Sequence, residues 1–132
     1  MAQKIKAGNA ERLLLPGRVS HQIASAGAGA DNICVRLVEI EPEHQQTFKR
    51  NRHYHPDVEE CIYVLEGEGC TYADTGEYSM SVGDTLIIPP NEHHVTRNTG
   101  RSILKLLCFF PTGKVTIKGE EEIRAGTSNV FN

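Results

Sequence analysis

The chain is a succession of short apolar runs that end at turn-forming residues. Residues 33–40 are rich in aliphatic and β-branched side chains and precede Pro42, and the most apolar run, residues 102–110, precedes Pro111. Such residues favour strands, and proline ends a strand because it cannot donate a ladder hydrogen bond. Helical periodicity extends over no more than one or two turns anywhere in the chain. The pattern therefore predicts an all-β protein.

Turns recur between these runs at near-regular spacing. Asp74–Gly76 separates the extended runs 70–73 and 77–82, and an Asp-x-Gly turn between alternating segments is typical of a β-hairpin. Gly83 and Asp84 form the next turn. The whole chain thus predicts about nine or ten short strands, which favours a β-sandwich or barrel over an α/β fold.

The length fits a single domain. A chain of 132 residues with 39% hydrophobic and 23% charged residues can bury one packed core. We predict three segments in it: an N-terminal extension over residues 1–32, with a short strand at Leu13–Leu15, a barrel core over residues 33–111, and a C-terminal tail over residues 112–132.

Charge and cysteine usage narrow the class of protein. The net charge of −3 argues against a nucleic-acid partner, which usually requires a clustered basic surface. No apolar stretch approaches the length of a membrane span, and residues 1–8 are not followed by the apolar region of a secretory signal. The four cysteines show no paired metal or redox spacing, so we interpret them as reduced thiols. These features predict a cytoplasmic protein without membrane or nucleic-acid partners.

Three histidines and one glutamate stand at spacings that can build a metal site. His53 and His55 alternate on an extended segment, so their side chains project to the same side. Glu60 follows a short loop at the start of a return strand, and His94 belongs to a third strand. Chance is a poor explanation for three histidines and one glutamate at these spacings. Three imidazoles and one carboxylate suit one divalent transition metal ion (Fe, Mn, Ni, Co or Zn) and leave positions for water or substrate.

The same residues resemble the two motifs of the cupin superfamily, in particular its small single-domain members of the cupin 2 type. The matching positions are His53, His55, Glu60 and Gly67 in the first motif and Gly83, Pro89, Asn91, His94 and Asn98 in the second. The chain departs from the family pattern at Thr47 and Asn91, where glycine is usual, and asparagine is the residue that best replaces glycine at positive φ. The resemblance implies a double-stranded β-helix (jelly-roll) cupin barrel and a homodimer.

Strand alternation from the four residues predicts which side chains line a substrate pocket. Counting in steps of two from Glu60, His94 and His53 selects inward positions, provided that no bulge intervenes. The predicted lining residues are Lys49, Asn51, Ile62, Val64 and Thr96. In the run 102–110, either the even-numbered or the odd-numbered residues face inward, and the sequence leaves both open. A metal at one end of a mainly apolar pocket is the usual form of a small-molecule site.

The resemblance constrains the fold more than the reaction, because this scaffold hosts many chemistries. A metal-dependent enzyme that acts on a small organic molecule, in particular a dioxygenase, is the leading hypothesis. A redox-neutral lyase, decarboxylase or isomerase is the alternative among enzymes. A module that binds or senses a ligand through its metal, without turnover, is the alternative outside them. The sequence contains no visible Ser/His/Asp or Cys/His arrangement for a nucleophilic mechanism.

Overall fold

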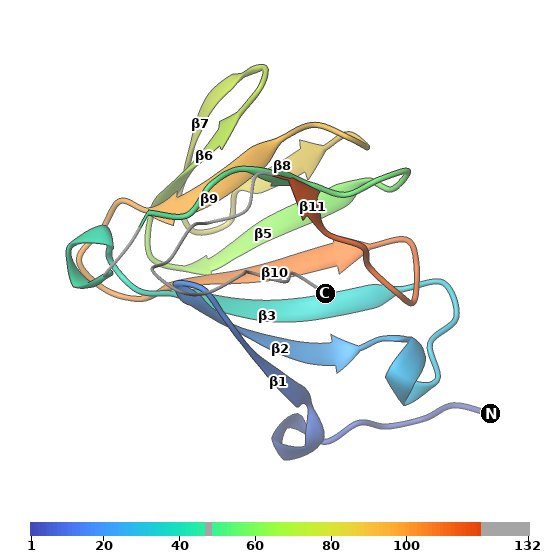
Figure 1. The fold of residues 1–132 in the computed structure, drawn as a ribbon. Coiled ribbons are helices and arrows are strands. Elements are labelled where there is room, and N and C mark those ends of the chain that lie inside the picture. Colours follow the sequence, from blue (N-terminus) through green and yellow to red (C-terminus); the bar gives the residue numbers. More distant parts are fainter. Residues whose placement is uncertain (47–48, 120–132) are drawn as a thin grey trace, which may run out of the picture.

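The computed structural model describes residues 1–46 and 49–119, in which strands are joined by turns and short 3₁₀ segments. One sheet has six strands in the order β1-β2-β3-β10-β5-β8, and each of its neighbouring pairs is antiparallel (Figure 1). Its strands are β1 (Glu11–Leu15), β2 (Arg18–Ala24), β3 (Cys34–Ile40), β5 (Glu60–Glu66), β8 (Thr85–Ile88) and β10 (Leu104–Phe110).

The second sheet has five strands in the order β11-β4-β9-β6-β7, also antiparallel, and it lies over the first (Figure 1). Its strands are β4 (His53–Tyr54), β6 (Gly69–Ala73), β7 (Gly76–Met80), β9 (His94–Asn98) and β11 (Lys118–Gly119). The 3₁₀ segments are η1 (Ala7–Asn9), η2 (Ala26–Ala28) and η3 (Glu43–Gln45). The predicted all-β fold is confirmed, and β1 and β2 extend the six-stranded sheet where only one N-terminal strand was predicted. Within the described ranges, no helix has the length and apolar character of a membrane span.

The core lies between the two sheets and follows strand alternation. In β10 the even-numbered residues are buried, which settles the alternative that the sequence left open for residues 102–110. In β3 the buried positions also alternate. The buried side chains of these two strands are Cys34, Arg36, Val38, Ile40, Leu104, Leu106, Cys108 and Phe110. Burial of their apolar members supplies much of the hydrophobic stabilisation of the fold.

Two turns have left-handed backbone, one at the end of β5 far from Glu60 and one before His94. Gly67 has φ +84°, and a Cβ at this position would lie 2.7 Å from the carbonyl oxygen of Ile103, so only glycine fits there without strain. Asn91 has φ +70°, which confirms that asparagine takes over the glycine position of the second motif. The backbone amide of Asn91 donates to the carbonyl oxygen of His55 at 3.1 Å, so this turn ties the loop before His94 to the segment of the other histidines.

Candidate metal centre

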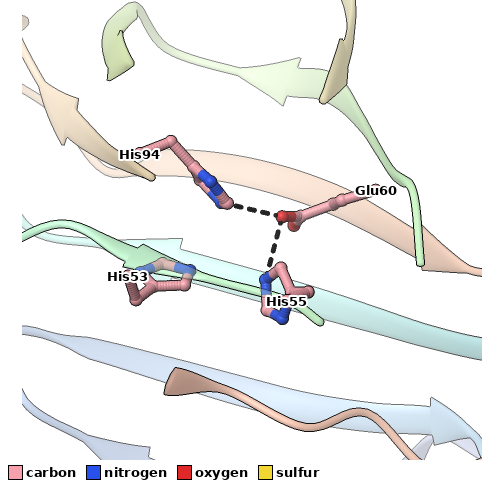
Figure 2. Close-up of side chains that lie close together, drawn as sticks. All are labelled: His53, His55, Glu60 and His94. Carbon is pink, nitrogen blue, oxygen red and sulfur yellow. Dashed lines mark hydrogen bonds and ion pairs between the residues drawn. The ribbon is translucent and has the colours of Figure 1, made fainter. Parts of the chain in front are cut away.

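The four candidate ligands converge from both sheets. His53 on β4 pairs directly with His94 on β9 in the five-stranded sheet, and His55 follows β4. Glu60 begins β5 in the six-stranded sheet. Figure 2 shows the four side chains pointing toward one another across the space between the sheets. One nitrogen or oxygen atom of each lies within 4.8 Å of all the others, which is a separation that one metal ion can bridge.

Hydrogen bonds on the outer side of two imidazoles direct their other nitrogens inward. Nδ1 of His55 lies 3.0 Å from the carbonyl oxygen of Thr116, and Nδ1 of His94 lies 2.8 Å from that of Glu92. A carbonyl oxygen only accepts, so each Nδ1 carries the hydrogen and donates it. In the neutral ring, Nε2 then holds the lone pair that a metal needs, as is usual for ligating histidines with a carbonyl partner.

Glu60 lies at the centre of the cluster. Its Oε1 is 3.0 Å from Nε2 of His94 and 3.2 Å from Nε2 of His55, and all three side chains are buried. Burial by itself would raise the pKa of Glu60, but the hydrogen bonds and charges of the two histidines outweigh it and lower that pKa well below its usual value. The carboxyl group is therefore ionised, and it supplies a negative charge to the cluster.

The neutral form of His53 is also favoured. Burial is the largest cause that lowers the pKa of His53 well below 6.5, and the neighbouring His94 and His55 lower it further. Lone pairs of neutral imidazoles and an ionised carboxylate cannot bond one another without a proton or a cation between them. The chemistry of this donor set, three borderline nitrogens and one oxygen, fits a divalent transition metal ion.

A cavity of about 60 Å³ adjoins the cluster, and it contains part of the predicted pocket. Ile62 and Thr96 line it, as do the buried Leu106 and Phe110 of β10. Val64 is fully buried, but it belongs to the apolar core beyond the cavity. Apolar side chains thus make up about half of the lining, and the candidate ligands lie in the wall of the cavity.

The structure corrects the expected direction of Lys49 and Asn51. Both are exposed, and they line a depression on the outer surface with Tyr72 and Arg97. The expectation extended strand alternation backward from His53, but β4 contains only two residues. Irregular backbone precedes it, so the two-residue period does not hold there.

Three arginines line the cavity instead, and none of them was predicted. They are Arg18 on β2, Arg36 on β3 and Arg50 before β4. A pattern in the sequence does point to Arg36, because it shares the alternation of Cys34, Val38 and Ile40, the buried face of β3. Arg18 shares the alternation of Ser20 on β2, but the sequence predicted no strand there, and Arg50 lies in irregular backbone before β4.

Cys108 also faces the cluster. Burial is the largest cause that raises the pKa of its thiol well above the usual value, and the charge of Glu60 raises it further, although Arg36 and Arg18 act in the opposite direction. A thiol in this state is protonated and unreactive, so it acts as a small apolar wall residue. All four cysteines of the chain are free in the structure.

A family model of the cupin domain matches residues 36–110, more than half of the chain. With the fold and the motif residues described above, this match establishes that the chain belongs to the cupin family. The predicted jelly-roll cupin barrel is therefore confirmed.

Three relatives show how varied the similar proteins are. An uncharacterized protein of Methanocaldococcus jannaschii is 41% identical over 56 residues, 42% of this chain and 45% of that protein. Quercetin 2,3-dioxygenase of Bacillus subtilis is 29% identical over 93 residues, 70% of this chain and 26% of that protein. The chain thus spans less than half the length of either relative. A solved sugar phosphate isomerase of the cupin superfamily from Silicibacter pomeroyi superposes with a TM-score of 0.64 at 26% identity, over 83% of this chain and 75% of that chain.

Metal affinity is expected to fall in acid. Burial works against a charge on His94, but the hydrogen bond and charge of Glu60 outweigh it and raise the pKa of His94 above 6.5. Below that pKa a metal must displace a proton from His94, so its affinity should fall about tenfold for each pH unit. The lowered pKa of His53 delays competition at that residue to stronger acid. Equilibrium dialysis against Zn²⁺ from pH 8 to 5 measures this, and an unchanged affinity over the range would contradict it.

Proposed function

We propose that this chain is a metal-dependent enzyme that acts on a small organic molecule. In this proposal His53, His55, Glu60 and His94 hold one divalent ion of Fe, Mn, Ni, Co or Zn. The observation that carries it is the convergence of the four groups between the sheets, with the outward nitrogens of His55 and His94 already engaged by carbonyl oxygens. When bound, the metal supplies Lewis acidity and a point of attachment for substrate.

The protein's own residues prepare the site for this role. The carbonyl oxygens of Thr116 and Glu92 fix the ring orientation of His55 and His94, so little freedom is lost when a ligand binds. The buried carboxylate of Glu60 balances part of a cation's charge. Ile62, Leu106 and Phe110, with the other apolar lining side chains, exclude bulk water, and exclusion of water strengthens every charge interaction within the cavity.

An oxygenase is the reaction class that we propose first. Its support is the similarity to quercetin 2,3-dioxygenase, which extends over 70% of this chain. A redox-neutral reaction such as isomerisation, elimination or decarboxylation is the second candidate. The similarity in structure to the sugar phosphate isomerase, which covers most of both chains, favours it. That the protein forms a homodimer remains a prediction from the family resemblance. That it is cytoplasmic remains a prediction from its cysteine usage.

Oxygen uptake and metal content together test the proposal. The purified chain, loaded anaerobically with Fe(II), is mixed with catechols, diketones, flavonols and short-chain acids, and both oxygen and products are measured. Oxygen consumption that requires Fe(II) and substrate, and that disappears in His53→Ala, supports the oxygenase. Product formed without oxygen supports the second candidate. Bound metal and bound ligand without turnover would indicate a binding module, and failure to take up any of the five metals would overturn the proposal.

A further inference from the structure

A segment that crosses from one sheet to the other forms part of the cavity wall. After β10 in the six-stranded sheet, the chain turns back and runs to β11 at the edge of the five-stranded sheet (Figure 1). We call residues 113–119 the strap. Along it Val115 and Ile117 are buried in the core, whereas Lys114 and Lys118 are exposed. The strap is therefore an extended segment with one apolar face, which is turned toward the core.

The strap stands between the cavity and an outer groove. Ile117 lines both of them, as does Arg36, and Val115 and Thr116 line the groove. The groove has a volume of about 860 Å³, whereas that of the cavity is about 60 Å³. The latter is far below the roughly 300 Å³ at which pockets for drug-sized ligands begin. A small organic molecule thus reaches the cavity only when part of the wall moves, and the strap is the part that adjoins the groove.

The backbone of the strap is paired at its two ends. At the first end, the amide of Gly113 donates to the carbonyl oxygen of Asp31 at 3.1 Å, and its carbonyl oxygen accepts from the amide of Ala26 at 2.7 Å. At the second end, the two residues of β11 pair with β4. Residues 114–117 between these ends lie outside the strands. A segment with so little pairing opens locally at lower cost than the strands beside it.

The middle of the strap supports a candidate metal ligand. Nδ1 of His55 donates to the carbonyl oxygen of Thr116 at 3.0 Å, which leaves Nε2 of the ring for a metal. The next residue, Ile117, lines the same cavity as His55. When the strap lifts, the imidazole of His55 therefore loses its acceptor as the cavity loses part of its wall.

We propose that the strap opens and closes the metal cavity: docked, it excludes water and orients His55, and lifted, it admits the ligand from the groove. The proposal rests on the proposed function, because the movement would serve a metal site that takes a small organic molecule. It adds that ligand entry and metal release depend on the same movement, since Thr116 and Ile117 are neighbours in one segment.

Gly113 allows the strap to be released at its end away from the candidate ligands. A Cβ on Gly113 would clash with the carbonyl oxygens of Ala30 and Asp31, so Gly113→Ala should break the two hydrogen bonds at this end. Gly27→Ala is the matched control in the adjoining segment η2. An added Cβ at Gly27 would meet Oγ of Ser25 at 3.7 Å, which is an ordinary contact.

Alkylation of cysteines in the metal-free chain measures the opening. Cys108 lines the cavity, and Cys70 is buried on β6 away from it. Mass spectrometry after treatment with iodoacetamide gives a rate for each thiol. Gly113→Ala should raise the rate at Cys108 about tenfold and leave that at Cys70 unchanged, because the opening is local. Ile117→Ala should act in the same way, whereas Ile117→Val keeps most of the side chain and should stay near the wild type.

Zinc release supplies the second measurement. The loaded chain is mixed with an excess of a chromophoric chelator, and the rate at which Zn²⁺ leaves is followed. Gly113→Ala should release zinc about tenfold faster, in parallel with the alkylation of Cys108, because His55 loses its outer partner whenever the strap is lifted. Gly27→Ala should release zinc as the wild type does.

An unchanged rate at Cys108 in Gly113→Ala and Ile117→Ala would overturn the proposal. A parallel rise at Cys70 in the variants, Ile117→Val included, would also overturn it, because the strap would then open only with the whole fold. Faster alkylation of Cys108 with unchanged zinc release would overturn the link to His55. A wild-type chain that binds no zinc contradicts the proposed function instead, and alkylation of the metal-free chain still decides on the strap.

Discussion

Replacement of His94 by alanine is expected to remove most of the metal affinity of this protein. His94 provides one of four convergent groups and is only 2% exposed, so no water or surface side chain can replace its nitrogen without rearrangement of the core. The loss should exceed the roughly ten- to hundredfold that removal of a supporting outer partner causes in metal sites. Competition of the purified variant with a chromophoric chelator for Zn²⁺ or Co²⁺ measures the affinity.

The neighbouring histidine provides a matched control. His93 precedes His94 in the chain and points to the other side, where its Nδ1 lies 3.4 Å from Asp74 and its side chain is 41% exposed. His93→Ala should therefore bind metal as the wild type does. His94→Gln retains an amide that can donate to Glu60, so it separates folding from metal binding. Equal affinity loss in the variants at positions 93 and 94, or none in either, would show that the cluster is not the metal site.

The four candidate ligands could be predicted because local rules place them. Two of them, His53 and His55, depend on alternation over three residues, and the positive φ of Asn91 keeps the turn that leads to His94. Glu60 begins a strand whose alternation also placed Ile62 correctly in the wall of the cavity. Such short-range rules hold along the regular strands β5 and β9, and alternation also held over residues 53–55 although β4 contains only two residues.

Arg18 and Arg50 could not be predicted in this way. Arg36 shares the buried alternation of β3, but its place beside the candidate ligands depends on long-range pairing. Arg18 reaches the site because β2 pairs with β3, where it lies opposite Ile40. Arg36 reaches it because β3 pairs with β10, opposite Cys108. Neither register follows from hydrophobic pattern alone. The incorrect direction of Lys49 has a different cause, since it assumed a regular strand where the backbone is irregular.

Replacement of Phe110 by alanine is expected to have the largest effect on stability among the cavity residues. Its ring is 3% exposed, packs edge-on against the imidazole of His55 with the centroids 4.8 Å apart, and lies next to the guanidinium of Arg36. Truncation would leave a void between the sheets, so the free energy of unfolding should fall by about 3–5 kcal/mol. Urea denaturation of the metal-free protein measures this loss without the contribution of bound metal.

Phe109 is the natural comparison, because it is the same residue type on the opposite face of the same strand. It is only half-buried and lines a surface depression with Ile33 and Ile87, so Phe109→Ala should cost about 1 kcal/mol. Phe110→Ala should also weaken metal binding, because His55 loses the ring that supports it, whereas Phe109→Ala should not. Phe110→Leu keeps most of the apolar volume and should lie between them in stability. If the two alanine variants unfold at the same urea concentration and bind metal equally, Phe110 does not support His55 as the structure indicates.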